Sequence, residues 1–198
     1  MLRILTAMSY PVLIYAGLTL VRPRTLAIIL AVLLLVHGVV TWPQRGLAQV
    51  SRLVLLPVVV VLLLAGLFNQ GQFFLLVPVL INAVLLIAFG RTLLWGPPMV
   101  ETFARLRGRE LPDEEVVYCR VVTGLWCLFF AFNGGVTLWL ALGATLAWWT
   151  LYTGVVSYML IGTLFTAEMV YRYWRFRPYD GSVTDPLFRG IFPPRGQG

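Results

Sequence analysis

The chain has 198 residues, of which 60% are hydrophobic and only 12% are charged. Soluble domains carry about 25% charged residues, and a chain with so little polar surface cannot cover itself in water. The composition therefore excludes a soluble enzyme, a small secreted protein and a disordered chain. All 15 basic residues are arginines, and with eight acids they give a net charge of +7. In a membrane protein this balance indicates loops that face anionic lipid, so nucleic acid is not an expected partner.

Six apolar runs separated by short polar breaks predict an all-α, polytopic membrane protein with six transmembrane helices. A spanning helix needs about 17–25 residues, and the chain lacks the alternating pattern of a membrane β-barrel. We expect a single transmembrane domain over residues 1–175 and a flexible cytoplasmic tail over residues 176–198. The six runs are Ile4–Val21, Thr25–Thr41, Leu53–Phe68, Phe73–Phe89, Val121–Leu142 and Leu146–Met169.

The arginines predict the orientation of these helices. Thirteen of them lie at the termini or in breaks on one side, and only Arg22 and Arg24 lie on the other. Positive loops stay in the cytoplasm, so both termini are expected there. Because the third run is short, the third and fourth runs either span the membrane fully or form a re-entrant hairpin around Asn69–Gln72. A cleaved signal peptide is the alternative for the N-terminus, but no small-x-small cleavage site follows the first run.

Residues 90–120 form the longer cytoplasmic loop. Apolar residues at helical spacing from Met99 to Leu106 predict a short amphipathic helix in the headgroup plane, between the fourth and fifth spans. The acids at 113–115 predict the start of a further helix that continues into the fifth span, because acids are favoured in a first helical turn. Arginines suit phosphate headgroups through their planar set of donors. The candidate headgroup or phosphate contacts are Arg91, Arg105, Arg107, Arg109 and Arg120.

Polar residues inside a bilayer are costly, so they are candidates for function. Asn82 and Asn133 each lie halfway along a run, and we predict a hydrogen bond between them near the midplane. Such bonds usually hold helices together, and substrate binding is the alternative. Glu168 precedes Arg172 by four residues, which favours a local ion pair. The alternative role for Glu168 is a proton relay with His37.

The last two runs are predicted to pack as an antiparallel hairpin, because only a few residues join them. Small residues let membrane helices approach closely, and Gly134 with Gly135 permits either a close approach or a kink. The residues expected to make this contact are Thr137, Ala141, Thr150, Gly154 and Ser157.

Recognisable reaction chemistry is missing from the sequence. It shows no nucleophile with a base, no phosphate loop, no paired catalytic carboxylates and no zinc-binding helix. Cys119 and Cys127 lie about 12 Å apart on one predicted helix, too far for a disulfide, and with His37 they form no metal-ligand pattern. We therefore predict no catalytic residue, no cofactor and no metal. Membrane-embedded transferases can have active sites with few recognisable residues, so the sequence leaves open whether the protein is an enzyme.

Three stretches together resemble a known family. They are Gly90-Arg91-Thr92-Leu93, Gly108-Arg109-Glu110-Leu111-Pro112, and Trp126-Cys127-Leu128-Phe129-Phe130 followed by Asn133. The chain resembles uncharacterised bacterial integral membrane proteins encoded among aryl-polyene (xanthomonadin-type) pigment genes. The second half is more distantly similar to intracellular septation protein A, with Arg109 at a lysine position. The likeness covers roughly Phe89 to Arg175. It implies a multi-pass protein of the bacterial inner membrane that serves envelope biogenesis, and it implies no reaction.

These observations favour a non-catalytic accessory protein of envelope or aryl-polyene lipid biogenesis, which scaffolds or passes on an apolar product. The expected partners are membrane lipids with anionic headgroups, and biosynthetic enzymes or a second copy of the chain. One alternative is an acyl or prenyl transferase that uses the arginine-rich loop to hold a phosphate-bearing donor. The other alternative is a small transporter, although such chains usually show repeated halves and broken helices near the midplane.

Overall fold

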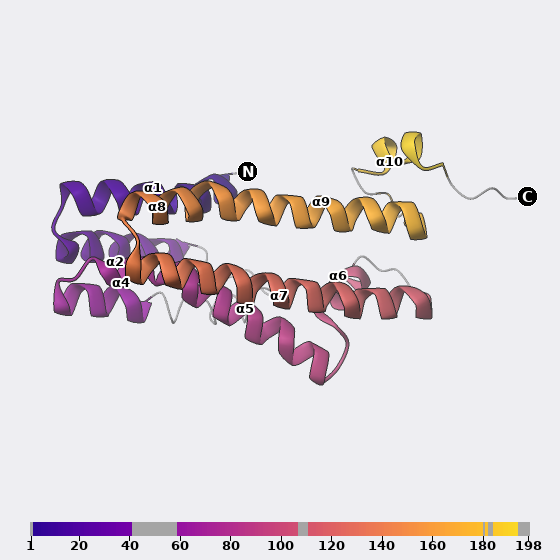
Figure 1. The fold of residues 1–198 in the computed structure, drawn as a ribbon, viewed down its shortest axis with the longest axis horizontal. Coiled ribbons are helices and arrows are strands. Elements are labelled where there is room, and N and C mark those ends of the chain that lie inside the picture. Colours follow the sequence, from indigo (N-terminus) through magenta and orange to yellow (C-terminus); the bar gives the residue numbers. More distant parts are fainter. Residues whose placement is uncertain (1, 41–58, 107–110, 180, 182–183, 194–198) are drawn as a thin grey trace, which may run out of the picture. The chain divides into compact units, whose positions relative to one another are not determined.

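The structure is a computed structural model that describes residues 2–40, 59–106, 111–179, 181 and 184–193; for residues 2–10, 31 and 33–40 it describes the backbone alone. All regular structure in this part of the chain is helical (Figure 1). The helices are α1 (Leu2–Leu20), α2 (Pro23–Val40), a helix over Val59–Phe68, α4 (Gln72–Leu75), α5 (Val77–Leu94), α6 (Met99–Arg105), α7 (Asp113–Gly143), α8 (Leu146–Leu151), the π-helical segment η1 (Tyr152–Val156), α9 (Ser157–Phe176) and α10 (Asp185–Ile191).

Three helical stretches of the described chain are long and apolar enough to cross a membrane: Gln72–Leu94, Asp113–Gly143 and Leu146–Phe176. The last two have 31 residues each, which makes them about 46 Å long against a hydrocarbon core of about 30 Å. Each of the two is therefore longer than a hydrocarbon core is thick. These three helices indicate a membrane protein, and they contain the fourth, fifth and sixth predicted runs.

The remaining predicted runs are described in part. The helices α1 and α2, with 19 and 18 residues, cover most of the first and second runs. The third run is described only from Val59 onward, as a helix that ends at Phe68. Asn69 follows it with a φ of 52°, a left-handed conformation that asparagine tolerates better than most residues. Several arginines of the orientation argument lie outside the described residues: Arg45, Arg52, Arg107, Arg109 and Arg195.

The chain divides into two compact units, where the sequence predicts one domain and a tail. Unit 1 contains Met1–Ala88 and Cys127–Tyr158, and unit 2 contains Phe89–Trp126 and Met159–Gly198. The long helices α5 and α7 each contribute to both units. Because the apolar runs continue through both units, hydrophobicity alone does not reveal the division.

Unit 1 has a core to which six helical stretches contribute. Its centre is the fully buried Trp149 of α8, packed with Phe74 of α4 and Ile14 of α1. The Trp149 indole N–H donates to the carbonyl of Leu75, 3.2 Å away, where α4 gives way to α5. Pro78 cannot donate a backbone N–H, so the helix ladder is weakened near this point. The other buried members of the core are Leu26, Ala27, Leu62, Ala65 and Leu140.

Glycines allow close contacts between the helices of unit 1. A Cβ atom on Gly17 would lie 2.8 Å from the side chain of Leu26, so α1 and α2 meet there. Gly154 of η1 faces Pro11 of α1, where a Cβ atom would make an ordinary contact at 3.5 Å. The sequence places Gly154 in the contact between the last two runs, and that prediction is wrong. A Cβ atom at this position would contact the proline ring of α1 and no atom of α7.

Unit 2 is held together around the short helix α6, which confirms the helix predicted from Met99 onward. Its first backbone N–H groups find partners on neighbouring helices: Met99 donates to the hydroxyl of Thr92 at 3.0 Å, and Val100 donates to that of Thr123 at 3.3 Å. These bonds satisfy donors that a helix start leaves free. Val100 also packs on Cys119, which is fully buried. The helix α7 begins at Asp113 with three acids in its first turn, as predicted.

The expected flexible tail contains a folded element in its described part. The short helix α10 lies in unit 2, and its Phe188 stacks on Tyr173 of α9 with ring centroids 4.1 Å apart. Phe188 and Asp185 of α10 are both buried. The sequence does not signal this helix, because glycines and prolines surround it and only seven residues form it.

Candidate functional site

A chain of three polar side chains in unit 1 is the best-formed candidate site, and we call it the asparagine network: Asn82, Asn133 and Tyr152. The Asn133 amide Nδ2 donates to Oδ1 of Asn82 at 3.1 Å, which confirms the predicted bond. The Tyr152 hydroxyl donates to Oδ1 of Asn133 at 3.0 Å. Asn82 in turn donates from Nδ2 to the carbonyl of Pro78 at 2.8 Å. The network therefore links α5, α7 and η1.

The backbone around the network explains how these groups reach one another. Gly134 follows Asn133, and a Cβ atom on it would lie 3.1 Å from Cβ of Asn82, so α5 and α7 approach closely here. The helix α7 continues through Gly134 and Gly135 in the α conformation, and of the two only Gly134 makes the close approach to α5. Thr137, one turn further along, donates to the carbonyl of Asn133 at 2.7 Å and is itself buried.

Two irregular helix segments lie beside the network. One is the junction of α4 and α5 ahead of Pro78, whose carbonyl accepts from Asn82. The other is η1, a π-helical turn that contains Tyr152 and interrupts the helical stretch Leu146–Phe176. π-turns widen a helix by one residue and occur frequently at functional sites. The sequence analysis did not predict Tyr152 or η1; the only available signal was the run of β-branched residues and glycine at 153–156.

The chemistry of the asparagine network is binding and positioning. Amides and phenols donate and accept hydrogen bonds, but neither takes up a proton near neutral pH. Each of the three side chains already makes a hydrogen bond to another group of the protein. Asn82 and Asn133 are buried, and Tyr152 is half-buried. This arrangement is typical of hydrogen bonds that hold membrane helices together.

A second polar cluster, the Tyr118 cluster, lies in unit 2 and consists of Tyr118, Glu168 and Arg172. Arg172 donates from Nε and Nη2 to Oε1 of Glu168, at 2.8 and 2.6 Å, which confirms the predicted local ion pair. The Tyr118 hydroxyl donates to the same oxygen at 3.4 Å, and the Arg172 guanidinium lies over the Tyr118 ring at 5.6 Å. The carboxylate is therefore neutralised and held in place from two sides.

The other predicted site residues belong to neither the asparagine network nor the Tyr118 cluster. The side chain of His37 lies outside the described residues, and so does its predicted relay with Glu168. Arg105 pairs with Glu101 of α6 at 2.8 Å. Arg120 is exposed and donates to the carbonyl of Leu93 at 3.3 Å, and Arg91 is exposed on the last turn of α5. The three described arginines of the predicted headgroup set thus all belong to unit 2.

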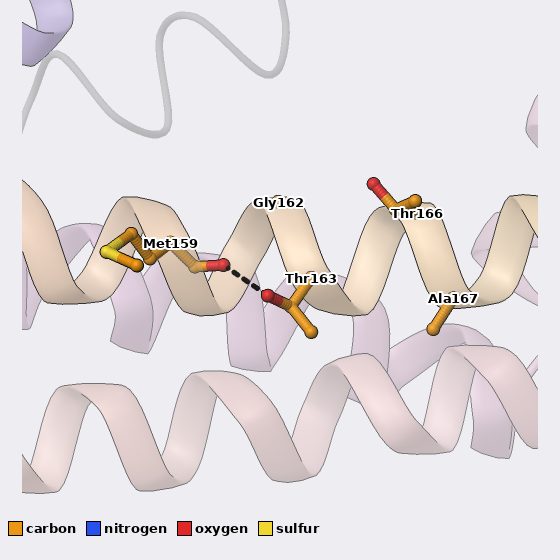
Figure 2. A pocket seen from close by; sticks show the side chains of 5 residues that line it. All are labelled: Met159, Gly162, Thr163, Thr166 and Ala167. Carbon is orange, nitrogen blue, oxygen red and sulfur yellow. Dashed lines mark hydrogen bonds between the residues drawn. The ribbon is translucent and has the colours of Figure 1, made fainter.

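An open groove runs along α9, with Met159, Gly162, Thr163, Thr166 and Ala167 as its lining (Figure 2). Thr163 donates its hydroxyl to the carbonyl of Met159 at 2.8 Å, so it adds no free donor to the groove. Small residues at this spacing are typical of faces where membrane helices pack. Within the described residues, no group of three His, Cys, Asp or Glu side chains is placed to hold a metal ion.

Comparison of the chain with protein-family models, with curated proteins and with solved structures gives no match. The resemblance to pigment-cluster membrane proteins therefore stays a prediction from the sequence.

Proposed function

We propose that the protein is a non-catalytic, multi-pass accessory protein of the bacterial inner membrane, which scaffolds or passes on an apolar product of envelope or aryl-polyene lipid biogenesis. In this proposal six helices cross the membrane and both termini lie in the cytoplasm. The observation that carries it is the asparagine network. Its side chains bond to one another and to a backbone carbonyl, which suits a device that holds helices together better than one that performs a reaction.

The distribution of side chains supports the membrane part of the proposal. Along α7 from Val121 to Leu142 the exposed large side chains are apolar, for example Leu128 and Phe132, while Asn133 and Thr137 are buried. A helix in water shows the reverse pattern, with polar groups outside. The Tyr118 cluster also supports a non-catalytic role, because its carboxylate is already bound by Arg172 and Tyr118.

A comparison of lipid and pigment extracts from a deletion strain and its parent tests the function. A normal product that accumulates in the wrong membrane supports passing on, and disordered assembly of biosynthetic enzymes with reduced product supports scaffolding. Loss of the product with accumulation of its precursor would instead favour the transferase. No change in any extract would contradict the proposal.

Complementation of the deletion strain tests the role of the network itself. A triple variant with Asn82→Leu, Asn133→Leu and Tyr152→Phe removes every partner together, so it leaves no buried amide without a bond. We expect this variant to restore the parental extract if the network only holds helices together. A variant that is folded and inserted, yet restores nothing, would assign the network a role in binding or chemistry.

A further inference from the structure

The helix α10 has a fixed place on the last turn of α9. The Tyr173 hydroxyl donates to Oδ1 of Asp185 at 2.6 Å, and its ring stacks on Phe188 with an interplanar angle of 8°. The other oxygen of Asp185 accepts from the backbone N–H of Gly181 at 2.8 Å. Tyr173, Asp185 and Phe188 are each at most 5% exposed. A stacked, buried and hydrogen-bonded contact of this kind fixes a short helix that would not be stable alone.

The chain turns back to make this contact possible. Arg177, directly after α9, has a φ of 52°, and Gly181 has a φ of 86°. Left-handed residues end helices and reverse the chain. The Arg177 guanidinium lies 4.9 Å from the ring centroid of Phe192, just beyond α10, so the turn is held by its own side chains. As a result α10 lies beside the end of α9 and not further along its axis (Figure 1).

The depth of Tyr173 places this contact in the headgroup layer. The sixth apolar run ends at Met169, and Tyr173 lies four residues later, about 6 Å along the helix. The headgroup layer on each side of a bilayer is about 5–8 Å thick. Tyr171 and Trp174 of the same turn are 46% and 52% exposed, as expected of aromatic side chains at a membrane interface.

Two large apolar side chains of α10 have no cover in the described structure. Leu187 and Ile191 are 64% and 59% exposed, and at a spacing of four residues they share one flank of the helix. Arg189 lies on a different flank, where its guanidinium is 5.1 Å from the ring centroid of Tyr179. Apolar side chains on one flank with arginines beside them are typical of helices that lie in a membrane interface.

We propose that α10 is an interfacial helix, which inserts Leu187 and Ile191 among the anionic lipid headgroups of the bilayer that α9 crosses. The exposed Arg189 then lies close to the lipid phosphates, where an arginine near an anionic surface adds to the attraction. This inference rests on the membrane part of the proposed function. It does not depend on the side of the membrane, because both leaflets have headgroups, or on any product.

Fluorescence quenching in vesicles of equal parts phosphatidylcholine and phosphatidylglycerol tests whether α10 lies in the membrane interface. The full chain carries Cys119→Ala and Cys127→Ala, and an environment-sensitive fluorophore is attached at Leu187→Cys. The matched control carries the fluorophore at Pro186→Cys, which is exposed on the same helix and lies about 100° around its axis from Leu187. We expect a nitroxide on the lipid headgroup to quench the fluorophore at 187 and iodide in the water to quench it weakly, with the opposite order at 186.

Three results would overturn the inference. Quenching by iodide that is equal at 187 and 186, with none by the nitroxide lipid, would place α10 in water. Protection from iodide without quenching by the nitroxide lipid would show that a protein covers this flank instead. Equal quenching by lipid in vesicles with and without phosphatidylglycerol would overturn the selectivity for anionic headgroups. None of these readouts changes if the protein proves to be an enzyme or a transporter, so the two proposals fail separately.

Discussion

At the scale of single residues, two adjacent glycines of α7 have different surroundings. A Cβ atom on Gly134 would lie 3.1 Å from Cβ of Asn82, whereas one on Gly135 would meet nothing within 4 Å. Cβ of Asn82 is fixed to the backbone of α5, so it moves only if the helices separate. The asparagine network therefore depends on the absence of a side chain at one of the two positions.

The variant Gly134→Ala is expected to destabilise the protein by about 1–3 kcal/mol, the usual cost of overpacking a close contact. Gly135→Ala is the matched control, and its higher helix propensity makes it neutral or up to about 1 kcal/mol more stable. Unfolding by sodium dodecyl sulfate, followed by helix content in mixed micelles, gives both values. Equal losses in the two variants would show that the contact with Asn82 is not made.

The bond between Asn82 and Asn133 has a coupling energy that a double-mutant cycle measures. Alanine at either position removes the bond, and alanine at both removes it once, so the cycle isolates the pair. We expect a coupling of about 0.6–1.7 kcal/mol, the range found for hydrogen bonds between membrane helices. Additive single effects would mean that the two amides do not interact. Asn82 with Thr19 serves as the control pair, because the Thr19 hydroxyl donates to carbonyls of its own helix, α1.

At the scale of elements, the stretch Leu146–Phe176 shows what one irregular turn does. The π-helical segment η1 changes the register between α8 and α9. It contains Tyr152, which bonds to Asn133, and Gly154, which faces Pro11 of α1. A regular α-helix repeats every 3.6 residues, so one extra residue rotates everything beyond it by about 100°. A helical face assigned from the sequence is therefore correct on only one side of such a turn.

One hydroxyl group makes a buried hydrogen bond between α9 and α10. Tyr173→Phe keeps the ring that stacks on Phe188 but removes the bond to the buried carboxylate of Asp185. Hydrogen bonds to charged groups contribute about 1.5–3 kcal/mol, so amide exchange across 185–191 is expected to rise about ten- to a hundredfold. Mass-spectrometric hydrogen exchange measures this change.

Tyr171→Phe is the matched control for that experiment. Tyr171 belongs to the same turn of α9, but its ring stacks on Tyr118 and its side chain is 46% exposed. We expect this variant to leave exchange in α10 unchanged. A similar rise in both variants would mean that loss of any tyrosine loosens the end of α9, and that the bond to Asp185 has no special part.

At the scale of the whole molecule, exposed apolar side chains can show which solvent surrounds a helix, because the cost of replacing them with a charged residue differs between water and lipid. Phe132 lies near the middle of the fifth apolar run and is 60% exposed. In water an arginine at an exposed position changes stability by less than about 0.5 kcal/mol. In a bilayer an arginine at the centre of a spanning helix costs about 2.5–3.5 kcal/mol.

We therefore expect Phe132→Arg to reduce membrane insertion and the yield of folded protein, at a free-energy cost of about 2.5–3.5 kcal/mol. The control, Val117→Arg, changes a side chain that is 65% exposed but lies four residues before the fifth run, where arginine reaches the headgroups. Fractionation and protease protection in cells measure insertion for both. If Phe132→Arg inserts as well as the control, hydrocarbon does not surround this part of α7.

The sequence by itself determined the membrane class, the helical state and most of the helix positions. Hydrocarbon leaves the backbone no partner except itself, so long apolar runs must form helices whatever their neighbours are. It also predicted the bond between Asn82 and Asn133, because two amides halfway along their helices are at equal depth. The ion pair of Glu168 and Arg172 followed from their spacing, since residues four apart on a helix are neighbours.

Tertiary structure alone decided which faces meet. Tyr152 joins the asparagine network through its bond to Asn133, and Gly154 faces Pro11 of α1. The helix α10 forms because Tyr173 holds it, although its own sequence is too short to fold alone. In a bilayer every face of an apolar helix has nearly the same affinity for lipid, so hydrophobicity does not specify rotation about the helix axis. Close packing and a few polar contacts set that rotation, and they depend on residues distant in the chain.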